Sequence, residues 1–201
     1  MNFLVIEGVD GAGKSSVAAG VSAWLGGQGR DVLSLREPGS TRVGERVREI
    51  LLDAEIGELH PWAEACLFTA CRTQMVAEIV RPALEEGKTV LMDRYFYSTV
   101  CYQGFAGGVA PDLLMQLSVQ AVGGVLPDRV LLLDLPAAAA LSRLGGNHDR
   151  MEAKGEAYME AVRQGYLQLA GQEPGRFVVL DAMASEANVL RAAIKALEGA
   201  S

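Results

Sequence analysis

One eight-residue segment near the start of the chain limits the possible folds more than any other feature. Residues 8–15 read Gly-Val-Asp-Gly-Ala-Gly-Lys-Ser and fit the pattern G-x-x-x-x-G-K-[ST]. A short apolar run at residues 3–7 precedes the segment, and a helical pattern at residues 14–25 follows it. A strand, a glycine-rich turn and a helix in this order form the phosphate-binding loop of nucleotide-binding α/β proteins. We therefore expect an α/β fold that binds a nucleotide.

Each residue type in this loop suits the binding of phosphate. Glycines let backbone N–H groups turn toward phosphate oxygens, and the N-terminus of the following helix adds positive potential. Lys14 is expected to reach the β- and γ-phosphates, and the Ser15 hydroxyl to ligate Mg²⁺. The predicted nucleotide-binding residues are Gly8, Gly11, Ala12, Gly13, Lys14, Ser15 and Ser16.

Short apolar runs alternate with longer helical patterns along the rest of the chain. Runs rich in Val, Leu and Ile predict strands at residues 3–7, 32–35, 89–92, 129–133 and 177–180. Helical patterns cover residues 14–25, 43–52, 61–86, 111–122, 136–144, 152–170 and 185–197. Nearly continuous apolar runs indicate strands covered on both faces. We predict a P-loop NTPase-type α/β fold with three layers: a five-stranded parallel sheet, helices on both faces and a short lid at about 143–151, in one domain spanning 1–201.

The composition argues against several other classes of protein. Half of the residues are hydrophobic and 21% are charged, so the chain has enough apolar surface for a core and is not expected to be disordered. The net charge of -7 argues against a nucleic-acid-binding face, and no apolar stretch is long enough for a membrane span. Three cysteines without a recognisable secretory leader or zinc spacing are typical of reduced thiols in a cytoplasmic protein.

The third predicted strand indicates which kind of nucleotide-binding protein this is. No Asn-Lys-x-Asp segment occurs, which argues against a GTPase that reads guanine. Asp93 and Arg94 end the strand, and an Asp followed by Arg suits a small kinase better than a large ATPase. At the carboxyl end of a parallel strand, Asp93 would face the ligand crevice and hold Mg²⁺ or its waters, with Arg94 as a phosphate fork. The alternative for this pair is a surface ion pair.

Five motifs occur in an order that resembles the thymidylate kinase family. They are Glu-Gly-Val-Asp-Gly-Ala-Gly-Lys-Ser-Ser at 7–16, Arg-Glu-Pro-Gly at 36–39, Phe-Thr-Ala-Cys-Arg at 68–72, Asp-Arg-Tyr at 93–95 with Ser98 and Tyr-Gln-Gly at 102–104, and His-Asp-Arg-Met-Glu at 148–152. The resemblance runs from residue 3 to about residue 182. It implies transfer of the γ-phosphate of ATP to dTMP, giving dTDP and ADP for dTTP biosynthesis, with Mg²⁺ and usually as a homodimer.

The resemblance also implies how thymine is bound. Phe68 and Arg72 are four residues apart in a helical pattern, so both side chains lie on one helix face. By resemblance, Phe68 stacks on the base and Arg72 binds its O4. In isolation, the pair would better fit a core phenylalanine beside an arginine whose charged end reaches solvent, and the other motifs reverse this preference.

Sugar and phosphate contacts of the acceptor are implied in the same way. Asp10 matches the residue that accepts a hydrogen bond from the 3′-hydroxyl, and Arg36 and Arg94 match those that hold the 5′-phosphate, a task that suits fork-shaped guanidinium groups. Tyr102 matches the position that crowds the 2′ side of the sugar. Thr99 and Gln103 are expected to line the same wall. For these last three residues, simple packing of a short helix is an equal alternative.

The chain departs from the family in its arginines. Members generally carry an extra arginine near the transferred phosphoryl group, in the phosphate-binding loop or in an arginine-rich lid. Here Gly11 occupies the loop position, and the lid region retains only Arg143 and Arg150. We expect these two arginines to stabilise developing charge when the lid closes about a hinge at residues 145–146.

Catalysis by this chain should need no general base. The acceptor is a phosphate whose second pKa is about 6, so it is mostly dianionic at neutral pH. Positioning and charge neutralisation are then the main tasks, and Lys14, Arg94, Arg150 and Arg143 are the predicted catalytic residues. Two alternatives stay open: a related kinase for another deoxynucleoside monophosphate, and a nucleotide-binding paralogue with impaired catalysis, which the reduced lid favours.

Overall fold

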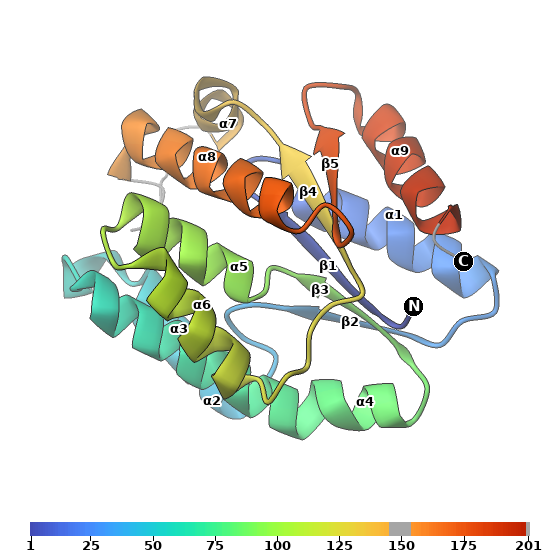
Figure 1. Ribbon diagram of the computed structural model, residues 1–201, viewed down its shortest axis with the longest axis horizontal. Coiled ribbons are helices and arrows are strands. Elements are labelled where there is room, and N and C mark those ends of the chain that lie inside the picture. Colours follow the sequence, from blue (N-terminus) through green and yellow to red (C-terminus); the bar gives the residue numbers. More distant parts are fainter. Residues whose placement is uncertain (145–153, 200–201) are drawn as a thin grey trace.

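The computed structural model describes residues 1–144 and 154–199, and its centre is one parallel sheet (Figure 1). The strand order is β2-β3-β1-β4-β5. The strands are β1 (Phe3–Gly8), β2 (Val32–Arg36), β3 (Thr89–Asp93), β4 (Arg129–Asp134) and β5 (Phe177–Asp181). The predicted strands are confirmed, and each extends one residue beyond the predicted range.

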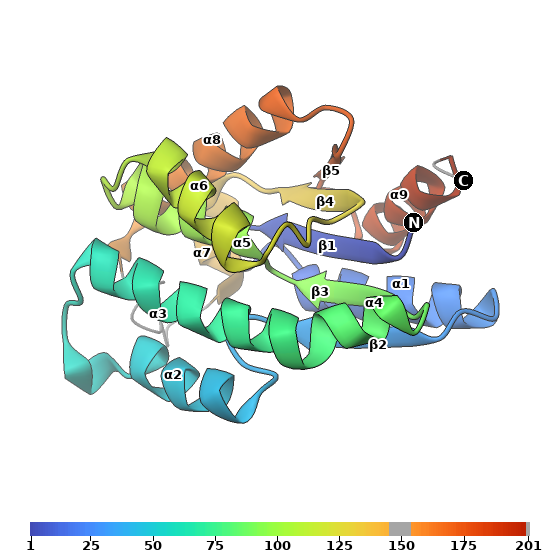
Figure 2. The same cartoon turned by 60° about the horizontal axis from the view of Figure 1, so that its bottom comes forward.

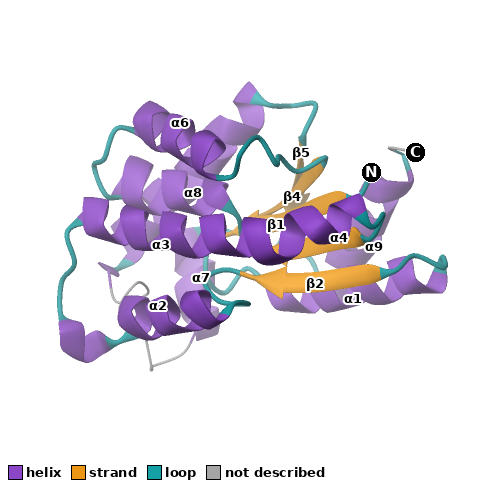
Figure 3. Ribbon diagram, turned by 90° about the horizontal axis from the view of Figure 1, so that it is seen from below, coloured by secondary structure: helices purple, strands orange, loops and turns teal. Residues whose placement is uncertain are grey.

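Helices connect the strands and cover both faces of the sheet. Those of ordinary α type are α1 (Lys14–Gly27), α2 (Arg42–Leu52), α3 (Pro61–Met75), α4 (Arg81–Glu85), α5 (Phe96–Thr99), α6 (Pro111–Ala121), α7 (Ala137–Leu144), α8 (Glu156–Gln172) and α9 (Glu186–Glu198). A short 3₁₀ turn, η1 (Ala54–Ile56), and two π-helical segments, η2 (Val76–Val80) and η3 (Val100–Ala106), complete the set. Figure 3 shows α1 and α4 on either side of β2. The predicted three-layer α/β fold is therefore confirmed.

Two helices differ from the prediction in a way that bears on function. The helix predicted at 61–86 is α3, η2 and α4 in succession, and Figure 2 shows them as one continuous coil beside α2. The α5 and η3 segments form a further helix that no predicted range contained. Their residues are largely aromatic or β-branched, types with low helix propensity. Burial stabilises this helix instead, because Phe96, Tyr97, Val100 and Cys101 are almost fully enclosed.

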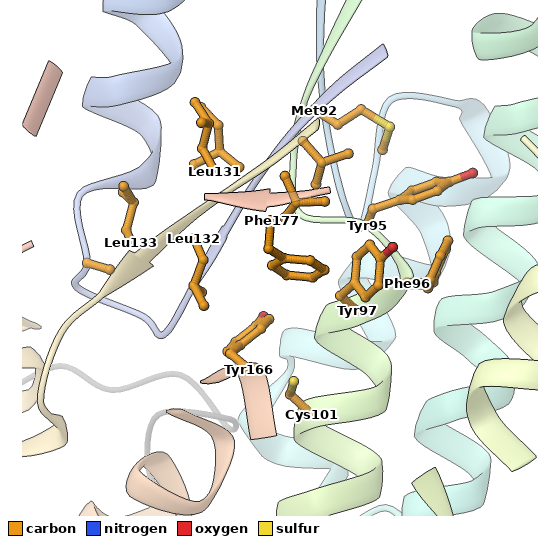
Figure 4. Close-up of a cluster of buried hydrophobic side chains, with 14 of the residues drawn as sticks. Met92, Tyr95, Phe96, Tyr97, Cys101, Leu131, Leu132, Leu133, Tyr166 and Phe177 are labelled. Atoms are coloured by element: carbon orange, nitrogen blue, oxygen red, sulfur yellow. The ribbon is translucent and has the colours of Figure 1, made fainter. Parts of the chain in front are cut away.

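Aromatic rings anchor this helix to the sheet (Figure 4). Successive ring pairs from Phe3 through Tyr95, Phe96 and Tyr97 to Phe177 have centroids 4.3–5.2 Å apart. The chain of rings thus runs from β1 to β5 through the first residues of α5. Edge-to-face and tilted ring pairs of this kind add about 0.5–1.5 kcal/mol each to the apolar burial. The segment that follows Asp93 is held rigidly as a result.

Part of the predicted lid lies outside the described residues. Among the residues expected there, Arg150 and the hinge at 145–146 fall in that gap, whereas Arg143 is described at the end of α7. The helix predicted at 152–170 begins at Glu156, after Gly155 with a positive φ of 88°. No helix in the described part of the chain is both long and apolar enough to cross a membrane.

Candidate functional site

The glycine-rich loop follows β1 and leads directly into α1. At Gly8, an added Cβ would lie 2.7 Å from the carbonyl oxygen of Leu133, and at Gly11 it would lie 2.7 Å from that of Ala140. Both glycines also have a positive φ, which L side chains rarely adopt. The chain therefore has no room for a side chain at position 11, so an arginine there would require α7 to move.

Lys14 is buried at the start of α1. Its Nζ donates to the carbonyl oxygen of Val9 at 2.9 Å and lies 3.9 Å from the Oδ1 atom of Asp10. Burial lowers the pKa of Lys14 to about 8, and the nearby charge of Arg94 adds to this effect. The ammonium group is thus held inside the loop, where a bound phosphate would neutralise it.

Strand register brings Asp93 next to the loop. Asp93 pairs with Ile6 on β1 and with Arg36 on β2, so all three lie near the same edge of the sheet. The Ser15 hydroxyl donates to Oδ2 of Asp93 at 2.9 Å, although the two residues are 78 positions apart. Hydroxyl and carboxylate oxygens are ligand types that Mg²⁺ accepts, so this pair fits the metal.

Arg94 lies at the centre of a polar cluster. It has a positive φ of 72°, which turns its side chain from the sheet end toward the loop. Its Nη1 donates to three oxygens, those of Gly8, Ser98 and Tyr166, at 3.0–3.3 Å. Its Nη2 forms an ion pair with Asp10 and donates to the Tyr102 hydroxyl at 3.1 Å. The side chain therefore pairs with Asp10 in a partly enclosed site and not with Asp93 at the surface.

Asp10 accepts hydrogen bonds from two sides. The Tyr102 hydroxyl donates to its Oδ2 at 2.7 Å, and Arg94 binds its Oδ1. Burial by itself would raise the pKa of Asp10, but the charges of Arg94 and Lys14 outweigh it and hold this pKa well below its usual range. Asp10 is thus a permanently ionised acceptor inside the loop.

Two cavities meet at this cluster. The larger, of about 1030 Å³, is lined by the loop residues 10–17, by Arg36 and Arg143, and by residues between 182 and 190 that follow β5. The smaller, of about 130 Å³, lies against α3 and η3 and includes Phe68, Thr99, Tyr102 and Gln103 in its wall. Asp10, Glu37, Arg48 and Arg94 line both cavities. Two arginines thus lie where a ligand in one cavity would meet a ligand in the other.

Arg72 differs from the interpretation in which its charged end reaches solvent. Its guanidinium is buried and forms an ion pair with the equally buried Glu37, with 2.7 Å between Nη2 and Oε2. Nη2 also donates to Oγ1 of Thr99 at 3.0 Å. Arg72 therefore does not reach solvent, and its role is to lie behind the smaller cavity. Its Nη1 is buried and has no hydrogen-bond partner among the described residues.

Two residues of the junction were not predicted as site residues. Glu37 stood within a quoted motif but received no role, and burial raises its pKa to about 7 despite the charge of Arg72. Arg48 lies on α2, where its Nη1 donates to the Pro38 carbonyl oxygen at 2.9 Å. Arg48 lies four residues after Gly44 on the same helix face, but the burial of Gly44 is known only from the structure, so the sequence carried no signal for Arg48.

The remaining predicted residues occupy the larger cavity or its rim. Arg36 lies at the exposed end of β2 and pairs with Glu45 at 3.2 Å. Arg143 donates from Nη2 to the Ala182 carbonyl oxygen at 2.9 Å and faces the loop at Gly11. The wall formed by residues 182–190 was not predicted, because its mostly small or apolar side chains form no recognisable motif.

Comparisons with known proteins show which family this chain resembles. A protein-family model described as "Thymidylate kinase" matches residues 6–193. The chain is 45% identical to a thymidylate kinase of Pelotomaculum thermopropionicum, over 98% of this chain and 92% of that protein. It is also 45% identical to one of Deinococcus radiodurans, over 92% and 90% of the two chains. A crystal structure of thymidylate kinase from Ehrlichia chaffeensis superposes with a TM-score of 0.80 at 28% identity, covering 98% of each chain.

Proposed function

The chain belongs to the thymidylate kinase family, and we infer that it transfers the γ-phosphate of ATP to dTMP, giving dTDP and ADP. The observation that carries this function is the junction of two cavities at Arg48 and Arg94. The larger cavity contains the phosphate-binding loop. The smaller cavity has aromatic side chains in its wall and a size that suits a base. A phosphate from each side would meet at the arginines.

ATP is proposed to occupy the larger cavity. The loop from Gly8 to Ser16 and the Lys14 ammonium would hold its phosphates, while the wall at residues 182–190 would enclose the nucleoside. Ser15 and Asp93 would hold Mg²⁺, which when bound neutralises charge on the β- and γ-phosphates. Arg143, at the rim of this cavity, is proposed to stabilise the transferred phosphoryl group. Arg150, proposed for the same task, lies outside the described residues.

The acceptor phosphate is proposed to bind at the junction. Arg94 would hold it from a guanidinium that Gly8 and Asp10 already orient, so little ordering is needed on binding. Arg48 would approach from α2, and Arg36 would exchange its exposed contact with Glu45 for the phosphate. No side chain is needed as a general base, because a dianionic phosphate is already nucleophilic. Charge neutralisation and alignment therefore supply the catalysis.

The base is proposed to be recognised by unsatisfied polar atoms. Phe68 offers a face for stacking and lines the smaller cavity together with Gln103. Two buried atoms have no partner among the described residues, Nη1 of Arg72 and Oε1 of Gln103. The first is a donor and the second an acceptor, and thymine presents an acceptor at O4 and a donor at N3. Because unpaired buried polar groups are costly, a ligand that pairs both is favoured.

Asp10 and Tyr102 are proposed to contact the sugar. Asp10 is ionised and lines the smaller cavity, so it would accept a hydrogen bond from the 3′-hydroxyl. Tyr102 is almost fully buried, with its hydroxyl bound to Asp10, and its ring would leave little space for a 2′-hydroxyl. Thr99 lines the same cavity and also orients Arg72.

The proposed function is tested by coupled ADP release from purified protein with ATP and Mg²⁺. dTMP, dUMP, dCMP, dGMP and AMP are offered separately as acceptors. We expect turnover with dTMP to exceed that with every other acceptor. A preference for another acceptor would instead support a related kinase, and no turnover with any of them would support a nucleotide-binding protein without catalysis.

Activity should fall at alkaline pH because of Lys14. Its pKa is lowered to about 8, so the ammonium form that neutralises phosphate is lost as pH rises through that value. We expect kcat/KM for ATP to fall about tenfold per pH unit above this point. The control is Lys14→Arg, whose guanidinium stays charged throughout, so its profile should remain flat even if its activity is low. A flat profile for the unchanged enzyme up to pH 10 would contradict the prediction.

We also propose that two copies associate through α2, α3 and α6, which lie side by side (Figure 3). Large apolar side chains there are at least a third exposed, namely Val43, Ile50, Trp62 and Leu113. Ile50→Asp should convert a dimer to a monomer in light scattering after size exclusion, because it places a charge in the apolar contact. Val179→Asp, at an equally exposed apolar residue on β5, is the matched control and should leave the mass unchanged.

The cytoplasm is the proposed location, and small molecules are the proposed ligands. Cys66, Cys71 and Cys101 are free thiols, which reducing compartments maintain. The net charge of -7 favours a protein whose positive groups serve local phosphate binding and not nucleic acid.

A further inference from the structure

The amide of Gln103 is held by a buried carboxylate outside the proposed ligand contacts. Gln103 lies in η3 and is 1% exposed. Its Nε2 donates to Oε2 of Glu64 on α3 at 3.0 Å. Its Oε1 has no partner in the described part of the chain, although the residue lines the smaller cavity. One end of the amide is therefore bound and the other end is left for a ligand.

Glu64 is held in turn by a lysine from the far side. Glu64 is fully buried, and Nζ of Lys154 lies 3.4 Å from both of its carboxylate oxygens. Lys154 also lies over the ring of Tyr158, with 4.8 Å between Nζ and the ring centroid. The Tyr158 hydroxyl donates to the Tyr102 carbonyl oxygen at 2.6 Å, next to Gln103 in the chain. The carboxylate is thus fixed between Lys154, which precedes α8, and Gln103 in η3.

Donor and acceptor chemistry decides which way the amide points. A carboxylate only accepts hydrogen bonds, and an ammonium group only donates them. Beside a carboxylate, Gln103 must present its NH₂ group, because the opposite orientation would place two acceptors together. The oxygen of Gln103 is therefore the end that is available to the base.

We propose that Glu64, held by Lys154, is a positioning residue that makes the enzyme select thymine over cytosine. This inference rests on the proposed function. An oxygen at Gln103 pairs with the N3–H donor of thymine but opposes N3 of cytosine, which is an acceptor. A freely rotating glutamine would accommodate N3 of either base, so the fixed orientation adds discrimination at N3 to that of Arg72 at O4.

The inference is tested with Glu64→Gln, a change of nearly equal volume. Lys154 would bind the new side-chain oxygen, which leaves its NH₂ group to donate to Oε1 of Gln103. The Gln103 amide would then turn its own NH₂ group toward the base. We expect the ratio of kcat/KM for dTMP to kcat/KM for dCMP to fall about tenfold or more, mainly through KM.

Lys154→Met is the matched control. It removes the lysine but leaves the carboxylate of Glu64, which still can only accept hydrogen bonds. The ratio of kcat/KM for dTMP to kcat/KM for dCMP should therefore stay near that of the unchanged enzyme. A structural role for Glu64 alone would lower activity with both nucleotides and leave the ratio unchanged.

A second test changes the nucleotide and leaves the protein unchanged, so it does not depend on the folding of a variant. The unchanged enzyme should bind dTMP methylated at N3 at least about tenfold more weakly than dTMP, because the N3 donor is lost. Equal binding, or an unchanged ratio in folded Glu64→Gln, would overturn the inference. Absence of dTMP turnover in the unchanged enzyme would instead contradict the proposed function, so the two failures are distinguishable.

Discussion

Replacement of Arg94 by lysine should lower kcat for dTMP phosphorylation about a thousandfold, in the range known for arginines that stabilise phosphoryl transfer. The structure shows why a lysine cannot substitute. Arg94 uses two nitrogens to bind oxygens of Gly8, Ser98 and Asp10 and still lines both cavities. Lysine has one nitrogen and no planar fork, so it cannot keep these contacts and hold a phosphate at once.

Steady-state kinetics with saturating ATP measure this effect. Arg176→Lys is the matched control, because Arg176 also pairs with a carboxylate, Glu173, and a tyrosine, Tyr97, but contributes to neither cavity at the junction. Its kcat should stay within about twofold of the original, as for most changes outside a site. A kcat for Arg94→Lys within tenfold of the unchanged enzyme would remove Arg94 from the catalytic residues.

Replacement of Arg72 by methionine should lower the free energy of unfolding by about 3–5 kcal/mol at pH 8. The change leaves the carboxylate of Glu37 buried without its ion-pair partner. Burial already raises the pKa of Glu37 from 4.5 to about 7 with the arginine present. Glu37 therefore binds a proton more tightly in the folded protein than in the unfolded chain. For this reason its contribution to the free energy of unfolding falls as pH rises from about 4.5 to about 7.

Urea unfolding at two pH values checks this prediction. The loss caused by Arg72→Met should be clearly smaller at pH 5.5, where Glu37 is protonated in the folded variant, than at pH 8. Adding Glu37→Gln to Arg72→Met should restore much of the stability at pH 8, because no charge is then left unpaired. Equal losses at both pH values would show that the ion pair is not the cause.

Much of the fold followed from local patterns. The five strands were predicted because each is a short apolar run, and the helices because their periodicity extends over several turns. The α5 and η3 segments were missed because their stability comes from burial, which no local propensity reflects. The helix predicted at 61–86 ends at Glu85, one residue before its predicted end. The π-helical turn within it, η2, has no sequence signal.

The candidate site was predicted residue by residue but not as a set of contacts. Phe68 and Arg72 were placed on one helix face, yet the ion pair of Arg72 with Glu37 joins residues 35 positions apart. Arg48 was missed because nothing in its local sequence distinguishes it from other surface arginines of α2. Arg48 becomes a candidate site residue only because it lines both cavities in the folded chain.

The sequence by itself determined the phosphate-binding loop and the strands. Glycine at positions 8 and 11 was already required there, because backbone conformation is a local property. Only the tertiary structure decided which charged group faces which. Arg94 binds Asp10 across 84 positions, and the Glu64 carboxylate accepts from the neutral amide of Gln103 across 39. Such pairing depends on distance and burial in the folded chain, which the packing of its helices and strands sets.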